Sequence, residues 1–222
     1  MAAFGSFGIF LAALLMLMAT RTPVGIALAL VAIGGTALFV SPSAISQLAA
    51  SSFSLSSNFI LVVVPLFILM GEVLSATGIG AGLFRTAELW MRRLPGALAI
   101  ATIWACAIFG SVCGSSPVTA TTIGSMAIPQ MLRRGYRSTL ALGATAAGGT
   151  LGILIPPSIA MIIYGVITDT SIGHLFMAGI LPGILLALLL SLTVVTIVMR
   201  DPAAAPPIVE KVSPGEKWRA LG

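Results

Sequence analysis

The chain has 222 residues, of which 58% are apolar and only 8% are charged, and its net charge at neutral pH is +5. A water-soluble domain cannot cover its surface with so few charges, and disordered chains are poor in apolar residues, so both classes are excluded. The composition predicts an all-α integral membrane protein, and the uncharged stretches between its charges give the elements in chain order.

The first three predicted elements are membrane-spanning helices. Residues Phe4 to Ala19 carry no charge and suffice for one span, and they lack the basic start of a signal peptide, which predicts a retained helix. The next uncharged stretch is too long for one span. Pro42 and eight serines between Ser41 and Asn58 divide it into spans near Val24–Val40 and Phe59–Ala76, joined by a serine-rich loop.

The segment from Gly78 to Pro95 combines charged and apolar residues at helical spacing. Its apolar positions are Leu83, Ala87, Trp90 and Met91, and its charged positions are Arg85, Glu88, Arg92 and Arg93. This pattern predicts an amphipathic helix that lies in the membrane interface. A helical connector in the aqueous phase is the alternative.

Residues 94–132 carry no charge and would form a helix of about 58 Å, roughly twice the hydrocarbon thickness of a bilayer. The stretch Gly110–Pro117, rich in Gly and Ser, divides it into pieces at 95–110 and 117–132 that are each about 24 Å long. Because each piece is short for a span, we expect a re-entrant helical hairpin with its tip near mid-membrane. Two full spans are the alternative.

Residues 138–168 form a second unusual stretch, which is interrupted at Gly148–Ser158. Pro156 and Pro157 lack amide donors and resist a continuous helix, so this stretch predicts one discontinuous span of two half-helices. A last span is expected near Gly179–Met199.

If the N-terminus lies on the outer side of the membrane, all 11 basic residues of this multi-span bundle lie on the inner side. That is the distribution expected for residues on the cytoplasmic side of a membrane.

Breaks in membrane helices expose backbone groups that can bind ions. Free carbonyls coordinate small cations, and free amides at a helix N-terminus hold anions. At the first break we expect Ser116 and Pro117 to open the second half-helix, and at the second break Pro157 and Ser158. The hydroxyl and carbonyl oxygens favour Na⁺ over a transition metal. Close helix packing by Gly and Ser is the alternative reading.

Other kinds of site lack the residues they require. Cys106 and Cys113 would lie about 10 Å apart on a helix, too far for a disulfide. The chain has a single histidine and no CxxC motif, so it lacks a ligand set for zinc or haem. It also has no GxxxxGK[ST] motif and therefore no ATP-binding loop of that kind. The few scattered charges do not indicate a nucleic-acid partner, and we expect no enzymatic activity.

Four stretches resemble the N-terminal half of the large membrane subunit, the DctM-like protein, of tripartite ATP-independent periplasmic (TRAP) transporters. They are Phe59–Glu72, Gly110–Pro129 (GSVCGSSPVTATTIGSMAIP), Gly148–Gly165 (GGTLGILIPPSIAMIIYG) and Gly173–Gly183 with its AGILPG. The resemblance implies half of an inverted-repeat elevator transporter in the bacterial inner membrane, with a periplasmic N-terminus. It implies Na⁺-coupled import of small organic acids, C4-dicarboxylate or sialic-acid-like, with Na⁺ as coupling ion and no other cofactor. The implied partners are a small DctQ-like membrane subunit and a DctP-like periplasmic solute-binding protein that delivers the carboxylate.

The resemblance also implies a division of labour along the chain. The expected parts are scaffold spans (1–76), an interfacial arm helix (77–94), half of the transport domain (95–168, with the hairpin at 95–132 and the broken helix at 138–168), a final span (169–199) and a cytosolic linker (200–222). The residues expected to bind ion or substrate are Ser111, Gly114, Ser115, Ser116, Gly149, Thr150, Gly152 and Pro157. Of these, Gly114, Ser115, Gly149 and Thr150 would hold one Na⁺.

The chain has about half the length expected for that family, and we therefore expect a truncated piece or split product. A transport-inactive scaffold or assembly fragment is one alternative function. Half of a related divalent-anion/sodium symporter is another, although the long motifs fit it less well.

Overall fold

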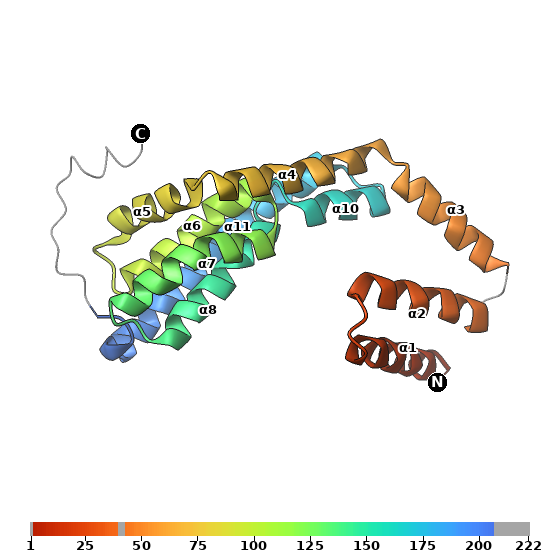
Figure 1. Cartoon of the computed structure of the whole chain (residues 1–222), viewed down its shortest axis with the longest axis horizontal. Coiled ribbons are helices and arrows are strands. Elements are labelled where there is room, and N and C mark those ends of the chain that lie inside the picture. The colour runs from red at the N-terminus through yellow and green to blue at the C-terminus, as the bar shows by residue number, and fades with distance from the viewer. Residues whose placement is uncertain (1, 40–42, 207–222) are drawn as a thin grey trace. The chain divides into compact units, whose positions relative to one another are not determined.

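A computed structural model of the chain describes residues 2–39 and 43–206, with side chains from residue 7 onward. The chain forms two compact units, Met1–Asn58 and Phe59–Gly222 (Figure 1). Within the described residues every regular element is a helix, which confirms the predicted all-α fold.

The first unit contains α1 (Ala2–Ala19), α2 (Val24–Phe39) and α3 (Ala44–Ser56). The helices predicted near Phe4–Ala19 and Val24–Val40 are present, and Phe10 of α1 packs on Phe39 of α2 with ring centroids 5.4 Å apart. The predicted serine-rich loop is wrong from residue 44 onward, because that segment is helical; Ser41 and Pro42 lie outside the described residues. Its serines do not interrupt the helix, since hydroxyls such as that of Ser52 donate to a carbonyl one turn back.

The second unit holds the remaining helices. In chain order they are η1 (Phe59–Val62), α4 (Val63–Ala76), α5 (Ile79–Met91), α6 (Ala97–Cys113), α7 (Ser116–Arg133), α8 (Ser138–Gly149), α9 (Leu151–Leu154), α10 (Ile159–Thr168), α11 (Ile172–Arg200) and η2 (Pro202–Ala204).

Among the described residues, Phe59–Ala76 and Ile172–Arg200 are long and apolar enough to cross a membrane. Ser138–Leu154 with Ile159–Thr168 gives a third candidate if this pair, bent by 40°, is one span. The discontinuous helix is therefore confirmed. The last span is longer than predicted, because α11 starts at Ile172 and runs through Pro182 to Arg200.

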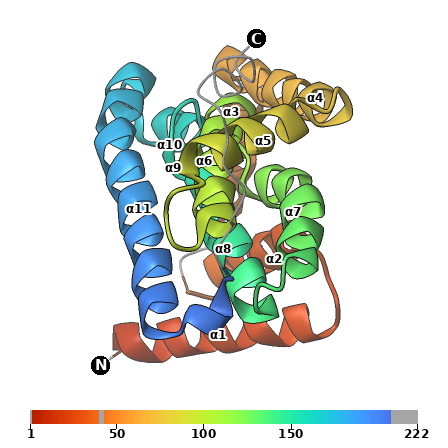
Figure 2. The same cartoon turned by 90° about the vertical axis from the view of Figure 1, so that its left-hand side faces the viewer.

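Helix α6 forms the centre of the second unit, with α5, α7, α8, α9 and α11 packed around it (Figure 2). Thirteen of its 17 residues are buried. A helix that is apolar on all sides is stable only when other helices cover it, and α6 has this character. The small alanines of α6 let its neighbours approach closely. Helices α6 and α7 form the predicted hairpin; that it is re-entrant in a membrane stays a prediction.

Charged side chains join the helix ends at one end of this unit. Glu88 of α5 pairs with Arg134 after α7 at 3.0 Å and with Arg92 at 3.4 Å. Arg137, just before α8, pairs with Asp201 after α11 at 2.7 Å. The end of α5, the end of α7, the start of α8 and the end of α11 therefore meet. We call this end of the second unit, where the basic residues lie, the basic end.

The predicted amphipathic helix α5 is present, but its assigned faces need correction. Glu88 is 6% exposed rather than on a solvated face, whereas Trp90 is 46% exposed. Phe84, which the periodicity did not select, is buried against the hairpin. Helix α5 turns Glu88 inward because the hairpin base supplies Arg134 as its partner, and a buried carboxylate requires one.

A tyrosine completes the basic end. The Tyr136 hydroxyl accepts a hydrogen bond from the first turn of α6, at the amide of Leu98, over 3.3 Å. Burial raises the pKa of Tyr136 above its usual value, so this hydroxyl stays neutral at physiological pH.

Candidate functional site

The tip of the hairpin is a turn of two residues, Gly114 and Ser115. Gly114 has φ +63°, a left-handed conformation that favours glycine, and Ser115 is extended and caps α7. The predicted break at Gly110–Pro117 is too wide, because α6 remains helical through Cys113. The N-cap is Ser115 rather than Ser116, which is the first helical residue.

The second break is also narrower than predicted. The chain stays helical from Ser138 to Leu154, with Thr150 between α8 and α9 at φ −64° and ψ −22°. The break consists of 155–158, where Pro156 and Pro157 cannot donate hydrogen bonds to the preceding turn. Pro157 and Ser158 were expected to open the next half-helix, but α10 begins at Ile159 with Ser158 as its N-cap, and the Ser158 hydroxyl donates to the carbonyl of Ile153 at 2.7 Å.

The two breaks meet. The Ile159 amide at the start of α10 donates to the Gly114 carbonyl across 3.3 Å. A Cβ added to Gly114 would lie 3.0 Å from the carbonyl oxygen of Pro157, so the two turns are in backbone contact. Two motifs more than 40 residues apart in sequence thereby form one site, within the single unit 59–222.

Glycines bring the helices beside these breaks unusually close. A Cβ on Gly110 would lie 2.5 Å from the Cα of Gly152, and a Cβ on Gly152 would lie 2.7 Å from the Thr119 hydroxyl oxygen. Gly149 packs on Ala120 in the same way, because a Cβ added to Gly149 would lie 2.7 Å from the Cβ of Ala120. Close packing is therefore one function of these glycines.

Thr119 links the tip to its supporting helices, and it was not among the residues predicted to bind ion or substrate. Its side chain is fully buried, and its hydroxyl donates to the Ser115 carbonyl at 2.7 Å. The Cys113 sulfur lies 3.1 Å from the same hydroxyl. The only signal in the sequence was its place four residues after Ser115, the spacing of helical neighbours.

The predicted site residues fall into two groups. Gly114, Ser115, Gly152 and Pro157 lie together at the contact between the breaks. The others lie nearby on single helices: Ser111, whose hydroxyl donates to the Ile108 carbonyl; Thr150, which is exposed and donates to the Ala147 carbonyl; Ser116, half-buried at the start of α7; and Gly149, packed on Ala120.

Backbone groups supply further polar atoms that sequence motifs could not identify. In the described part of the chain, the carbonyls of Val112 and Cys113 at the end of α6 accept no hydrogen bond, and neither do those of Leu154 and Ile155. The first amides of α7 and α10 likewise lack acceptors, except for that of Ile159. Helix ends of both polarities thus meet here, which suits a small cation beside an anionic group.

The hairpin and the broken helix themselves bring no charged side chain to this site, since 94–132 and 138–168 contain no Asp, Glu, Lys or Arg. The described residues also contain no cluster of three or more His, Cys, Asp or Glu that could hold a metal. The polar groups that these two segments contribute are therefore backbone dipoles and hydroxyls. Such groups match the hard oxygen ligands that Na⁺ prefers, and they would supply its coordination without a fixed charge.

Comparison with known proteins gives the family. The family model described as "Tripartite ATP-independent periplasmic transporter, DctM component" matches residues 11–220. The C4-dicarboxylate TRAP transporter large permease protein DctM of Pseudomonas aeruginosa is 42% identical over 165 residues, 74% of this chain and 38% of its own length. The corresponding protein of Rhodobacter capsulatus is 34% identical over 94% of this chain and 50% of its own length. The isethionate TRAP transporter permease protein DctMQ of Oleidesulfovibrio alaskensis is 37% identical over 84% of this chain and 28% of its own length.

The chain thus spans half or less of the length of these curated relatives. They are transporter permeases and not enzymes. The motif resemblance is confirmed by a match that covers nearly the whole chain: the protein is a membrane protein of the DctM component family of tripartite ATP-independent periplasmic transporters.

Proposed function

We propose that this chain is the membrane part of a Na⁺-coupled importer of small organic acids. The meeting of the two helix breaks supports this most directly, because it assembles free carbonyls, free amides and hydroxyls in a chain that belongs to a permease family. Paired helix breaks of this kind are typical of the midplane sites of secondary transporters.

The coupling ion would bind at the hairpin tip. The carbonyls at the end of α6 and around Leu154 provide oxygen ligands, together with the hydroxyls of Ser115 and Thr150 and the backbone of Gly114 and Gly149. Thr150 is exposed, and rotation of its side chain would turn its hydroxyl from the Ala147 carbonyl toward an ion.

The substrate would be a small anion. The N-termini of α7 and α10 point their free amides into the same site, and helix N-termini bind carboxylate and similar groups. The relatives described above carry the names of C4-dicarboxylate and isethionate transporters, whose substrates share a small size and negative charge. We propose a C4-dicarboxylate or a similar small acid, including sialic-acid-like compounds, for this protein.

We propose that the chain acts in the bacterial inner membrane with a small membrane subunit and a periplasmic solute-binding protein. Its N-terminus would be periplasmic, which places the basic end in the cytoplasm. The hairpin and broken helix would move as part of an elevator relative to the scaffold spans at 1–76.

Sodium binding can be tested on the purified chain without partner or substrate. A ligand that binds only the folded state raises the midpoint of thermal unfolding. We expect NaCl to raise this midpoint relative to KCl at equal ionic strength, and Ser115→Ala and Thr150→Val to reduce the difference. Ser125→Ala and Thr168→Val remove exposed hydroxyls elsewhere and should leave it unchanged. Equal midpoints in Na⁺ and K⁺ would refute the ion site.

Transport requires a second measurement. Proteoliposomes that contain the chain, its small membrane subunit and a binding protein should accumulate labelled succinate when Na⁺ is higher outside than inside. Accumulation without a Na⁺ gradient would contradict coupling. Na⁺ stabilisation without uptake would identify the chain as a binding-competent part that does not transport by itself.

A further inference from the structure

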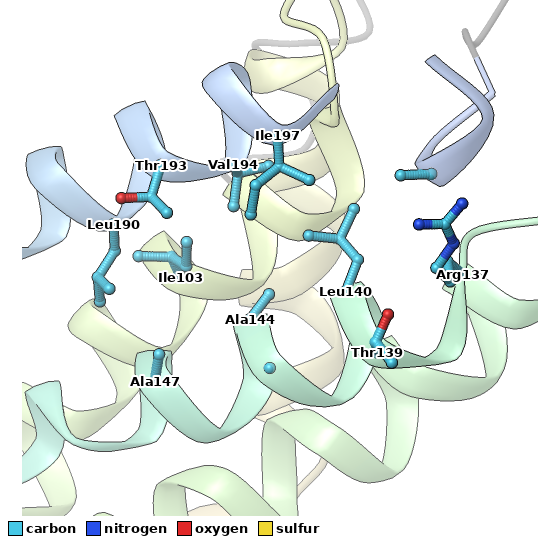
Figure 3. Close-up of a pocket in the computed structure, with 12 residues that line it drawn as sticks. Ile103, Arg137, Thr139, Leu140, Ala144, Ala147, Leu190, Thr193, Val194 and Ile197 are labelled. Atoms are coloured by element: carbon cyan, nitrogen blue, oxygen red, sulfur yellow. The ribbon is translucent and has the colours of Figure 1, made fainter. Parts of the chain in front are cut away.

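A cavity of about 260 Å³ lies beside the basic end, between α6, α8 and α11 (Figure 3). It is separate from the site at the helix breaks. Its walls include Ile103 of α6, Leu140 and Ala144 of α8, and Leu190 and Val194 of α11, with Arg137 at one end.

The cavity is elongated along the helices. Along α8 its lining extends from Arg137, just before the helix, to Ala147, with Leu140 and Ala144 between them at helical spacing (Figure 3). Ten residues of helix measure about 15 Å, which is half of the roughly 30 Å hydrocarbon core of a bilayer. The cavity therefore has the depth of one membrane leaflet.

Its two ends differ in chemistry. Arg137 stands at the charged end, where its amide also donates to the Ala204 carbonyl at 2.9 Å. Nearly all the remaining wall is aliphatic, and the Thr193 hydroxyl donates to the Leu189 carbonyl of its own helix. A molecule that fits would have an anionic end and a long apolar part.

Small residues on α8 keep the cavity open. A Cβ added to Gly143 would meet no atom within 4 Å, although α8 packs against both α6 and α11. Ala144 and Ala147 also leave room opposite the larger side chains of α11. An apolar space of this size does not hold ordered water, so an apolar occupant fits it best.

We propose that this cavity binds an anionic phospholipid from the leaflet at the basic end. One acyl chain would lie between α8 and α11, and the phosphate would contact Arg137. This inference depends only on the membrane location of the chain and not on its proposed transport activity.

Arg137 is available for a phosphate. Its pairing with Asp201 spans 2.7 Å, but the two side chains are 53% and 41% exposed, and exposed ion pairs contribute little stability. A guanidinium binds phosphate through two parallel hydrogen bonds, and basic pockets between membrane helices bind anionic head groups. The phosphate could therefore displace or share the Asp201 contact.

Native mass spectrometry of the purified chain with added phosphatidylglycerol or phosphatidylcholine tests the proposal. We expect preferential retention of phosphatidylglycerol. Arg137→Gln should reduce that preference about fivefold, the factor for one basic residue at an anionic lipid surface. Gly143→Leu fills the cavity and should reduce retention of both lipids.

Two variants serve as matched controls. Gly82→Leu adds the same side chain to an exposed helical glycine of α5 that also has no atom within 4 Å, and it should retain lipid as the native chain does. Asp201→Asn breaks the same ion pair as Arg137→Gln but keeps the arginine. It should leave the preference for phosphatidylglycerol unchanged or increase it, because the guanidinium gains freedom to bind phosphate.

Several results would overturn the proposal. Equal loss of preference in Asp201→Asn and Arg137→Gln would show that the ion pair has only a structural role. Unchanged lipid retention in Gly143→Leu would place the lipid elsewhere. If Gly143→Leu instead converted a dimer into a monomer, a second copy would be the occupant. If lipid bound only after deletion of 207–222, that segment would be the occupant.

Discussion

The two ends of the α6–α7 hairpin are held by different forces. At the tip, Gly114 contacts the second break through backbone atoms, and neither of the two contacting segments contains a charged residue. At the base, the buried Glu88 carboxylate pairs with the partly exposed Arg134, with Tyr136 beside them. The base is held by charged side chains, whereas the tip is held by close backbone packing and uncharged hydrogen bonds.

This difference suits a transporter. Backbone contacts between glycines can separate and re-form without desolvating a charge, and they leave polar atoms free for a ligand. The buried Glu88 carboxylate resists separation from its arginines because an unpaired buried charge is costly. We therefore expect the tip to respond to ligands and the base to keep α5 attached to the hairpin. Three substitutions test this comparison.

The largest effect is expected at the base. Glu88→Ala leaves Arg134 and Arg92 without their carboxylate and should lower the free energy of unfolding by about 3 kcal/mol. Asp201→Asn removes a half-exposed pair at the same end and should cost less than about 1 kcal/mol. Thermal unfolding in detergent measures both. Similar losses for the two would show that burial of Glu88 does not strengthen the base.

An intermediate effect is expected where the helices cross near the tip. In Gly110→Ala the new Cβ would lie 2.5 Å from the Cα of Gly152, and backbone cannot move aside as a flexible side chain can. We expect a loss of about 1–3 kcal/mol in the same unfolding assay. Gly143→Ala is the control, since it meets no atom and should raise stability by up to about 1 kcal/mol. If Gly110→Ala were as stable as this control, the close approach would not be needed.

The smallest effect is expected inside the tip. Thr119→Val keeps the shape of the side chain but removes the hydroxyl that donates to the Ser115 carbonyl. The Thr119 amide still donates to that carbonyl at 3.0 Å, so we expect a loss of only about 1 kcal/mol. Thr121→Val removes an exposed hydroxyl from the same helix and should change little. Thermal unfolding measures both variants. If Thr119→Val were as stable as Thr121→Val, the Thr119 hydroxyl would not support the turn.

Much of the fold could be predicted from the sequence, because its signals act over a few residues. Missing charges marked the apolar helices, and Pro156 with Pro157 placed the second break to within a few residues. Segment 44–56 was predicted to be a loop because serine is frequent in loops, but its hydroxyls bond within the helix. Glu88 was grouped with the charged positions of the amphipathic helix, and its burial was not foreseen because its partner, Arg134, is far away in the sequence.

The candidate site shows the same limit. Gly114, Ser115, Gly152 and Pro157 were selected from their residue types and lie together, whereas Thr119 and the carbonyls of Val112 and Leu154 were not selected. Free backbone groups depend on where each helix ends, and both breaks proved shorter than Gly and Ser content suggested. Only the three-dimensional arrangement shows which carbonyls have no donor.

The sequence by itself determined the membrane class, most of the helices and the presence of two breaks, since hydropathy and the missing amides of proline are local properties. The family followed from motifs that lie within those breaks. The tertiary structure decided what each small residue does. Gly110 and Gly143 are both helical glycines, yet one lies against the backbone of Gly152 and the other faces an open cavity. That distinction depends on the neighbours that folding brings to each position.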